Sequence, residues 1–255
     1  MPMNPKTSRK RLDVLLVERG LAESRQKAQA MILAGEVEID GKRADKAGLN
    51  TAENAHLEVH SRLQKYASRG GFKLEGALDD FQVSPGGKIC LDVGASNGGF
   101  TDCLLQRGAV RVYAVDVNTD QLAWKLREDP RVVPIKKNAR ELSAVDLPET
   151  VGLIVADVSF ISVKKILPGA VQCAKSSAEF LILIKPQFEL EREEVGKGGI
   201  VRESGLHQKA IESVRSAAQS IGLVCLQVEP SKLMGVEGNQ EYFLHARKGA
   251  EVESR

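Results

Sequence analysis

The feature that most constrains the fold of this chain is an alternation of short apolar segments and helical segments after residue 65. The expected strands are Lys88–Val93, Val110–Val117, Val132–Lys136, Leu153–Asp157, Phe180–Lys185, Leu223–Val228 and Glu241–Ala246. The expected helices include Phe100–Arg107, Gln121–Arg127, Val163–Cys173 and His207–Ile221. Near-continuous apolar strands belong in a mainly parallel sheet that helices cover on both faces. We therefore predict an α/β domain with a seven-stranded, mainly parallel sheet.

The composition agrees with a folded protein of this size. The 255 residues are 42% hydrophobic and 27% charged, values that are ordinary for globular proteins. The four cysteines form no C-x-x-C pair, so the sequence predicts neither a zinc site nor a redox motif. The N-terminus lacks the apolar segment of a signal peptide, and the longest apolar runs are far shorter than a membrane span. We expect a cytoplasmic protein with no bound metal and no membrane segment.

Residues 1–64 are expected to form a small α+β domain of their own, with residues 1–8 flexible. Apolar residues at helical spacing predict helices at 12–17 and 25–33, and Ser24 is placed to cap the second of them. Val37–Ile39 and Leu57–Val59 alternate like paired strands. The larger domain then covers residues 65–255.

Basic side chains gather in two stretches that contain no acidic residue: Lys6, Arg9, Lys10 and Arg11, then Arg62, Lys65, Arg69 and Lys73. Local clusters of this kind suit contacts with nucleic-acid phosphates, and they make Arg69 a candidate RNA contact. A solvated terminus and a charged linker would give the same pattern.

The small domain carries a recognisable set of short motifs: Arg11-Leu12-Asp13, Ser24-Arg25-x-x-Ala28, Gly35-x-Val37 and Ile39-Asp40-Gly41. This set resembles the S-four-type RNA-binding domain of ribosomal proteins and RNA-modifying enzymes. The resemblance implies that the second helix presents basic side chains to structured RNA. Candidate phosphate contacts are Arg11, Arg25 and Lys27, with Lys42 and Arg43 as weaker ones. Exposed helix charges without a ligand are the alternative.

A glycine-rich turn, Gly94-Ala95-Ser96-Asn97-Gly98-Gly99, follows the first strand of the larger domain. A turn of this kind between a strand and a helix lets a ligand approach the backbone closely. Its glycine spacing matches neither the dinucleotide fingerprint nor the phosphate-binding loop. The preceding Asp92 would repel a pyrophosphate but suits a cationic ligand, which points to S-adenosylmethionine. An ordinary turn between strand and helix is the alternative.

Further residues extend this candidate cofactor site. Asp116 ends the second strand, where a carboxylate can accept hydrogen bonds from both ribose hydroxyls of a nucleoside. Asn138 follows the third strand and either reaches the adenine or serves as a turn residue. The full set of cofactor candidates is Asp92, Gly94, Ala95, Ser96, Gly98, Gly99, Phe100, Asp116, Val117, Asn138 and Asp157.

Four charged residues of the larger domain fit no packing role. Asp157 and Lys185 end apolar strands, Glu241 adjoins the last strand, and Lys73 lies in a helical segment before the first. Charges at the ends of neighbouring strands share one rim of a sheet, so we expect a common cleft in which lysines and acids alter each other's proton affinity. A structural network of ion pairs is the alternative.

The surrounding motifs are Arg69-Gly70-Gly71-Phe72-Lys73-Leu74, Asp157-Val158-Ser159-Phe160, Ile184-Lys185-Pro186-Gln187-Phe188 and Asn239-x-Glu241-Tyr242-Phe243. They resemble the Lys-Asp-Lys-Glu tetrad of RrmJ/FtsJ-type ribose 2′-O-methyltransferases. Together with the S-four-type domain and the loop at 196–202, residues 9–248 are similar to the TlyA family of bacterial rRNA 2′-O-methyltransferases, whose members are often labelled haemolysins.

This resemblance implies a Rossmann-like class I methyltransferase fold, S-adenosylmethionine as cofactor, and ribosomal RNA or ribosomal subunits as partner. It makes Lys185 the residue that activates the ribose hydroxyl, held by Asp157 and Glu241. Lys73 would supply a second positive charge and help to hold the nucleotide.

Other functions are weaker expectations. Exocyclic amine methylation usually relies on an Asn/Asp-Pro-Pro-aromatic turn, and the corresponding turn here is Asp157-Val158-Ser159-Phe160. Cytosine C5 methylation needs a nucleophilic cysteine, commonly directly after a proline, and none of the four cysteines follows a proline. A non-catalytic rRNA-binding or assembly factor is a second class. A membrane-lytic protein is a third, although the sequence contains no amphipathic membrane stretch. The sequence indicates no oligomeric state.

Overall fold

The computed structural model describes residues 8–22, 24–33, 35–59, 65–235 and 238–249. Its contacts divide the chain into two compact units, residues 1–65 and 66–255, one residue beyond the boundary expected from the sequence. The basic residues Lys6 and Arg62 lie outside the described residues, as do residues 1–7 of the segment expected to be flexible.

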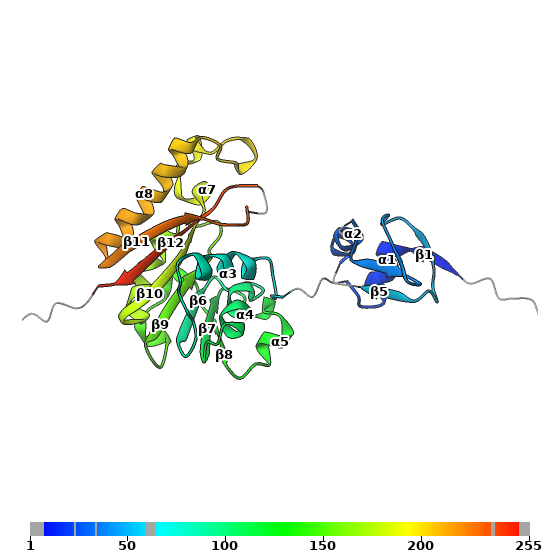
Figure 1. Ribbon diagram of the computed structural model, residues 1–255, viewed down its shortest axis with the longest axis horizontal. Helices are drawn as coiled ribbons and strands as arrows, with labels where there is room; N and C mark the ends of the chain where they lie inside the picture. Colours follow the sequence, from blue (N-terminus) through cyan, green and yellow to red (C-terminus); the bar gives the residue numbers. More distant parts are fainter. Residues whose placement is uncertain (1–7, 23, 34, 60–64, 236–237, 250–255) are drawn as a thin grey trace, which may run out of the picture. The chain divides into compact units, whose positions relative to one another are not determined.

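The small unit packs two helices against short strands (Figure 1). Its elements are β1 (Arg9–Arg11), α1 (Leu12–Glu18), α2 (Arg25–Leu33), β2 (Val37–Ile39), β3 (Lys42–Arg43), β4 (Asn50–Ala52) and β5 (Leu57–Val59). Within the described residues, β3, β2 and β5 form one antiparallel sheet, which includes the predicted pair of strands. The hydrophobic core of the small unit includes Leu12, Leu16 and Ile32. Ser24 accepts a hydrogen bond from the Lys27 backbone N–H, as its predicted capping role requires.

One strand pairing in this unit was not expected from the sequence. Arg9–Arg11, interpreted as a basic stretch at the terminus, forms strand β1 and pairs antiparallel with β4. A three-residue strand of basic residues carries no apolar alternation, so the pattern that reveals strands was absent. The pairing anchors Arg11 at the start of helix α1.

The large unit is built on one sheet with helices on both faces (Figure 1). Its strands are β6 (Ile89–Val93), β7 (Arg111–Asp116), β8 (Val132–Lys136), β9 (Val151–Ala156), β10 (Ala174–Ile184), β11 (Leu223–Pro230) and β12 (Tyr242–Lys248). In the described part of the chain these seven strands run in the order β11-β12-β10-β9-β6-β7-β8. β12 is antiparallel to both of its neighbours, and the remaining paired strands are parallel. The predicted seven-stranded, mainly parallel sheet is confirmed.

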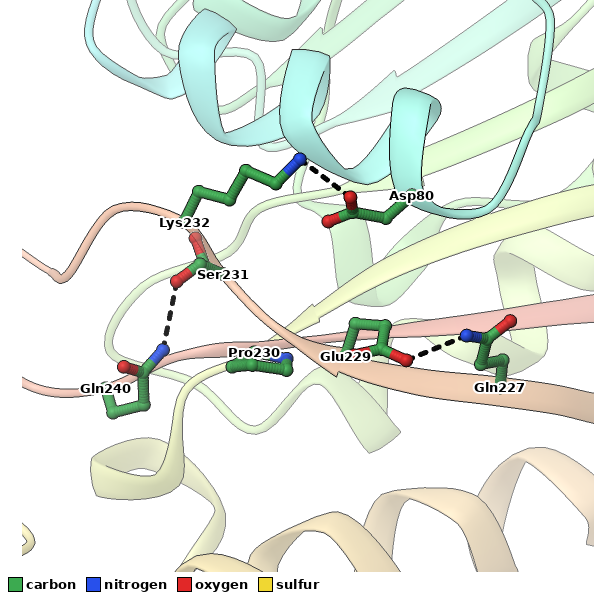
Figure 2. Close-up of a pocket in the computed structure, with 7 residues that line it drawn as sticks. All are labelled: Asp80, Gln227, Glu229, Pro230, Ser231, Lys232 and Gln240. Atoms are coloured by element: carbon green, nitrogen blue, oxygen red, sulfur yellow. Dashed lines mark hydrogen bonds and ion pairs between the residues drawn. The ribbon is translucent and has the colours of Figure 1, made fainter.

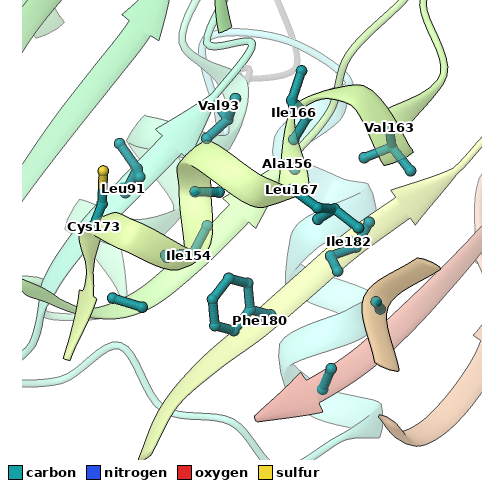
Figure 3. Close-up of a cluster of buried hydrophobic side chains, with 14 of the residues drawn as sticks. Leu91, Val93, Ile154, Ala156, Val163, Ile166, Leu167, Cys173, Phe180 and Ile182 are labelled. Atoms are coloured by element: carbon teal, nitrogen blue, oxygen red, sulfur yellow. The ribbon is translucent and has the colours of Figure 1, made fainter. Parts of the chain in front are cut away.

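Alternating residues of the central strands enter two separate hydrophobic cores. Leu91, Ile154 and Phe180 face the core that α6 (Leu167–Cys173) and α8 (Ser204–Ser220) cover (Figure 3). Cys90 and Leu153 face the other core, against α3 (Gly70–Asp80), α4 (Gly99–Gln106) and α5 (Trp124–Arg127). Burial on both faces explains why these strands read as continuous apolar runs in the sequence.

Two predicted helices are shorter than the sequence suggested. The segment 121–127 divides into a 3₁₀ turn, Thr119–Gln121, and helix α5. The segment 163–173 divides into a 3₁₀ turn, Val163–Lys165, and helix α6, which has Pro168 in its first turn. Proline lacks the N–H that a continuing helix needs, so a new helix begins there. The extra helix α7 (Pro186–Glu189) is separated from β10 by Lys185 alone.

Candidate active site

Three of the four predicted catalytic residues lie at one edge of the large sheet. Asp157 directly follows β9, Lys185 directly follows β10, and Glu241 directly precedes the antiparallel strand β12. The strand register pairs Ile184 with Tyr242, and these are neighbours of Lys185 and Glu241. Adjacent strands therefore bring the three charges to the carboxyl ends of the parallel strands, which is where such sheets bind ligands.

The charges form two ion pairs. Lys73, on α3, places Nζ 2.5 Å from Glu241 Oε2, and both side chains are buried. Lys185 is also buried and places Nζ 2.6 Å from Asp157 Oδ1. The structure thus pairs Glu241 with Lys73, whereas the sequence analysis expected Glu241 to hold Lys185. The second contact of Lys185 is a hydrogen bond that Nζ donates to Ser159 Oγ over 2.8 Å.

The backbone of Glu241 is fixed by the loop that precedes β12. Its carbonyl accepts a hydrogen bond from the Ser231 N–H over 2.8 Å. Gln240 donates from Nε2 to the Ser231 carbonyl, and this bond lies in the wall of a surface pocket (Figure 2). That pocket is lined by Asp80, Gln227, Glu229, Pro230, Ser231, Lys232 and Gln240. It contains none of the predicted catalytic or cofactor residues, and the hydrogen bonds of Ser231 and Gln240 in its wall hold the backbone at Glu241.

Asn239 and His207 hold the neighbouring loop at 196–202. The Asn239 side chain accepts from the Val201 N–H and donates to the Gly199 carbonyl. His207 Nε2 lies 2.9 Å from the Val201 carbonyl, and Nδ1 lies 2.9 Å from the Tyr242 hydroxyl. Since a carbonyl only accepts, Nε2 carries the proton and Nδ1 accepts from the tyrosine. Residues on both sides of Glu241 therefore fasten this loop beside the ion pairs.

The glycine turn approaches other parts of the chain very closely. Gly94 has φ +87°, and a Cβ there would lie 2.4 Å from the Asp157 carbonyl oxygen. A Cβ at Gly98 would meet Leu126 of α5, and one at Gly99 would meet Ser68. At Gly94 the neighbouring atom belongs to the backbone and cannot rotate away, so this position requires glycine. The three glycines bring the turn after β6 close to Asp157, to α5 and to the segment before α3.

Asp92 is the acid expected at the candidate cofactor site. It is fully buried, and Oδ2 accepts a hydrogen bond from the Thr101 hydroxyl over 2.6 Å. Among the described residues, Asp92 Oδ1 is one of few buried polar atoms without a hydrogen-bond partner. Burial raises the pKa of Asp92 to about 7. A cation bound nearby would favour the ionised form, so this orphaned oxygen fits a positively charged ligand.

Asp116 and its neighbours line the next part of the turn. Asp116 ends β7, and its carboxylate accepts hydrogen bonds from the backbone N–H groups of Ser96 and Asn118. Val117 follows and is exposed, which leaves an apolar side chain beside this carboxylate. Asn138 caps a 3₁₀ turn through its side-chain oxygen, the turn role that the sequence left open.

Phe100 differs from the expectation. Its ring is buried and stacks on Phe243, with ring centroids 6.1 Å apart. The side chain belongs to the core, so any cofactor contact would have to come from its backbone.

An exposed aromatic side chain lies in the turn that follows Asp157. Phe160 is 90% exposed and has a φ of +64°, a left-handed conformation that is rare for a bulky residue. Its ring contacts that of Phe188, with centroids 5.5 Å apart. Strained backbone of this kind concentrates at functional sites. A flat, exposed apolar ring in this turn can hold a planar ligand such as a base.

In the small unit, one buried acid organises two of the predicted RNA contacts. Asp13 is fully buried, and its two oxygens accept hydrogen bonds from Arg11 over 2.9 Å each. The same carboxylate accepts from Arg25 over 3.2 Å and from Gln29 over 2.8 Å. The Arg11 guanidinium holds the pKa of Asp13 well below its usual range. The arginine side chains are 51% and 57% exposed, so their outer faces are held toward solvent.

The other candidate RNA contacts are exposed at separate places. Lys27 lies on α2, and Lys42 and Arg43 lie on β3. The Arg43 guanidinium lies over the backbone of Gly35, which leaves no room for a Cβ there. Arg69 is exposed at the start of α3, one helical turn before Lys73. A contact of these residues with RNA stays a prediction.

Comparisons with known proteins match both units. Residues 66–248 match the family model of the FtsJ-like methyltransferases, and residues 10–51 match the S4 domain. The chain is 46% identical to the 16S/23S rRNA (cytidine-2′-O)-methyltransferase TlyA of Mycobacterium tuberculosis, over 94% of this chain and 90% of that protein. The chain belongs to the TlyA family of FtsJ-like methyltransferases.

Two further relatives of this TlyA-family chain carry a haemolysin name. Hemolysin A of Brachyspira hyodysenteriae is 43% identical over 92% of this chain and 98% of that protein. A solved Streptococcus thermophilus structure, named as a candidate hemolysin, has a TM-score of 0.75 and 40% identity over 97% of this chain and 93% of that one. In the described part of the TlyA-family chain, no helix is long and apolar enough to cross a membrane.

Each unit of the TlyA-family chain contains contact residues that were not among the predicted site residues. Ser159, Phe160, Phe188 and Asp13 all stood within recognised motifs, but no role was given to them. The signal for Asp13 was an acid between the apolar residues Leu12 and Val14, two positions after Arg11. Ser159 and Phe160 gave no periodic signal, because their roles depend on the turn that follows β9.

Proposed function

We propose that this protein transfers a methyl group from S-adenosylmethionine to ribose 2′-hydroxyls of ribosomal RNA. The observation that carries the proposal is the pair of buried lysine–carboxylate contacts, Lys185–Asp157 and Lys73–Glu241, at the carboxyl edge of the sheet. A ribose hydroxyl is a weak acid, and its oxygen becomes a good nucleophile only as its proton leaves. The carboxylates hold the two lysines in place, and a lysine in its amine form can accept that proton.

The cofactor fits the turn after β6. Asp92, whose Oδ1 lacks a partner, would face its positive charge, and Asp116 would accept from its ribose hydroxyls. Exposed Val117 would pack against its adenine. When bound, S-adenosylmethionine supplies a methyl group on a sulfonium centre that a nucleophile can attack. Contacts of Ala95, Ser96 and Asn138 with the cofactor remain predictions.

Lys185 is the proposed base. Its ammonium is paired with Asp157, and the amine form can take the proton of a hydroxyl placed beside Nζ. Lys73 is paired with Glu241 and would hold the nucleotide through charge and hydrogen bonds. The protein's further contribution is alignment, because fixing the hydroxyl oxygen in line with the methyl group removes much of the entropic barrier.

Phe160 provides a testable contact with the target base. We expect Phe160→Ala to lower kcat/KM for rRNA about 10- to 100-fold, because one base–aromatic stack is worth roughly 1–3 kcal/mol. The Kd for S-adenosylmethionine should not change. Phe160→Tyr, which keeps a ring, serves as the matched control in steady-state kinetics. Full activity of the alanine variant would contradict the stacking role.

The small unit is proposed to bind structured rRNA through Arg11 and Arg25. We expect Asp13→Asn to weaken rRNA binding about tenfold, because removing the buried charge releases both guanidinium groups. The slope of log Kd against log salt should stay constant, since both arginines keep their charge. Arg11→Ala should instead reduce that slope by about one.

A filter-binding titration at several salt concentrations measures both effects. Asp45→Asn is the matched control, because Asp45 is an exposed acid of the same unit. It should leave rRNA binding intact. If Asp13→Asn binds rRNA as the wild type does, the positioning of the two arginines is not needed for recognition.

The proposed function is tested by incubating the purified protein with labelled S-adenosylmethionine and isolated small subunits, large subunits or protein-free rRNA. Incorporation of label into rRNA supports a catalytic role and identifies the preferred substrate. Cofactor and RNA binding without transfer to any of these substrates would favour a binding-only assembly factor.

A further inference from the structure

Ser159 contacts the proposed catalytic lysine, although the tetrad does not include it. Lys185 Nζ donates a hydrogen bond to Ser159 Oγ over 2.8 Å. Ser159 lies in the turn after β9 and is exposed, so its hydroxyl is not required for core packing. We propose that Ser159 is a positioning residue that sets the direction of the Lys185 amine and passes its proton to solvent. This inference rests on the function proposed above.

The two partners of Lys185 differ in geometry. Asp157 Oδ1 lies 2.6 Å from Nζ but outside hydrogen-bond alignment, so this carboxylate attracts the charge without fixing the N–H directions. The bond to Ser159 is aligned. The tetrahedral Nζ is bonded to Cε and has three further directions, which hold its protons and, in the amine form, a lone pair. A hydrogen bond that fixes one of these directions stops rotation about the Cε–Nζ bond. Ser159 therefore determines where the remaining positions point, including the lone pair that must meet the ribose hydroxyl.

The turn that carries Ser159 has a constrained backbone. Val158 before it is buried, and Phe160 after it has a φ of +64°. A left-handed phenylalanine persists only where the surrounding structure requires it. The strained turn carries the Ser159 hydroxyl that accepts from Lys185 and leaves the ring of Phe160 exposed against Phe188, three residues after Lys185. One turn thus carries both the residue that orients Lys185 and the proposed contact with the nucleobase.

The exposure of Ser159 also gives the proton a route. As the ribose oxygen forms its bond to the methyl carbon, its proton passes to Lys185 Nζ, and the electron pair of the broken carbon–sulfur bond stays on sulfur. The resulting ammonium must lose one proton before the next turnover. Ser159 Oγ accepts from Nζ and is in contact with water, so it can take this proton and release its own to solvent.

Ser159→Ala and Ser159→Thr test the inference in the full-length protein. The readouts are kcat and KM for rRNA, the Kd for S-adenosylmethionine by calorimetry, and the thermal midpoint. For Ser159→Ala we expect kcat to fall about 10- to 100-fold, the loss that matches one hydrogen bond to a charged group. KM, the cofactor Kd and the midpoint should be unchanged. Ser159→Thr keeps the hydroxyl and should restore most of kcat.

The matched control is Ser216→Ala, which removes an exposed hydroxyl from α8 and should behave as the wild type. An unchanged kcat for Ser159→Ala overturns the inference, and so does a loss confined to KM, which would make Ser159 an RNA contact. Failure of Ser159→Thr to restore kcat also overturns it, provided the midpoint is unchanged. If the wild type itself forms no 2′-O-methylated nucleoside, the proposed function fails, and this inference fails with it.

Discussion

Replacing Lys185 with alanine is expected to lower methyl transfer to rRNA by about 10³-fold, within the range that a general base contributes. Lys185 is buried against Asp157 and Ser159, and water that fills its place cannot be held in the same alignment. The candidate cofactor residues on the turn after β6 are not altered by this change. Calorimetry should therefore give the wild-type Kd for S-adenosylmethionine.

Two further variants sharpen this experiment. Lys185→Met keeps the length of the side chain without its charge and should be as inactive as the alanine variant. Lys209→Ala removes an exposed lysine of α8 that is paired with Glu194, and it should retain full activity. Equal loss of cofactor binding and transfer in the Lys185 variants would refute the assigned role, because it would make Lys185 part of the cofactor site.

The second large effect is expected for Gly94→Ala. A Cβ at this position would lie 2.4 Å from the Asp157 carbonyl oxygen, a backbone atom that cannot rotate away. Either the turn after β6 or the start of the Asp157–Phe160 turn must shift, and both belong to the proposed site. We expect the Kd for S-adenosylmethionine to rise at least about 100-fold and transfer to be lost, since small displacements of a positioned site are costly.

Gly87→Ala is the matched control for this change. Gly87 also has a positive φ, +71°, but a Cβ there meets nothing within 4 Å. The two variants share the cost of a left-handed alanine, about 1–2 kcal/mol, and differ in the collision. Gly87→Ala should lower the thermal midpoint slightly and bind the cofactor normally. If both variants bind it equally well, the close approach of Gly94 to Asp157 is not needed for the site.

Much of the large unit could be predicted from the sequence, because its strands are buried on both faces. Leu153–Ala156 and Phe180–Ile184 read as apolar runs, and the charges that follow them, Asp157 and Lys185, therefore marked one rim of the sheet. The turn after β6 could be predicted from its glycines. Glycines at these positions permit backbone approaches that no other residue allows.

The sequence could not reveal which charges pair. Lys73 lies 168 positions before Glu241, and only the packing of α3 beside β12 brings the two together. The roles of Ser159 and Asp13 were hidden in the same way, since each depends on the side-chain direction set by a particular turn or helix. Strand β1 was missed because three basic residues show no alternation, and its pairing with β4 depends on the tertiary fold.

The most direct test of this account is the chemical identity of the nucleoside that the protein methylates. Ribosomal subunits treated with the protein and S-adenosylmethionine would be digested to nucleosides and analysed by mass spectrometry. Fragmentation separates base from sugar and so shows which of them carries the methyl group. We predict a 2′-O-methylated nucleoside that is absent when Lys185→Ala is used. A methylated base would contradict the proposed role of the Lys185–Asp157 and Lys73–Glu241 pairs, while leaving the methyltransferase fold intact.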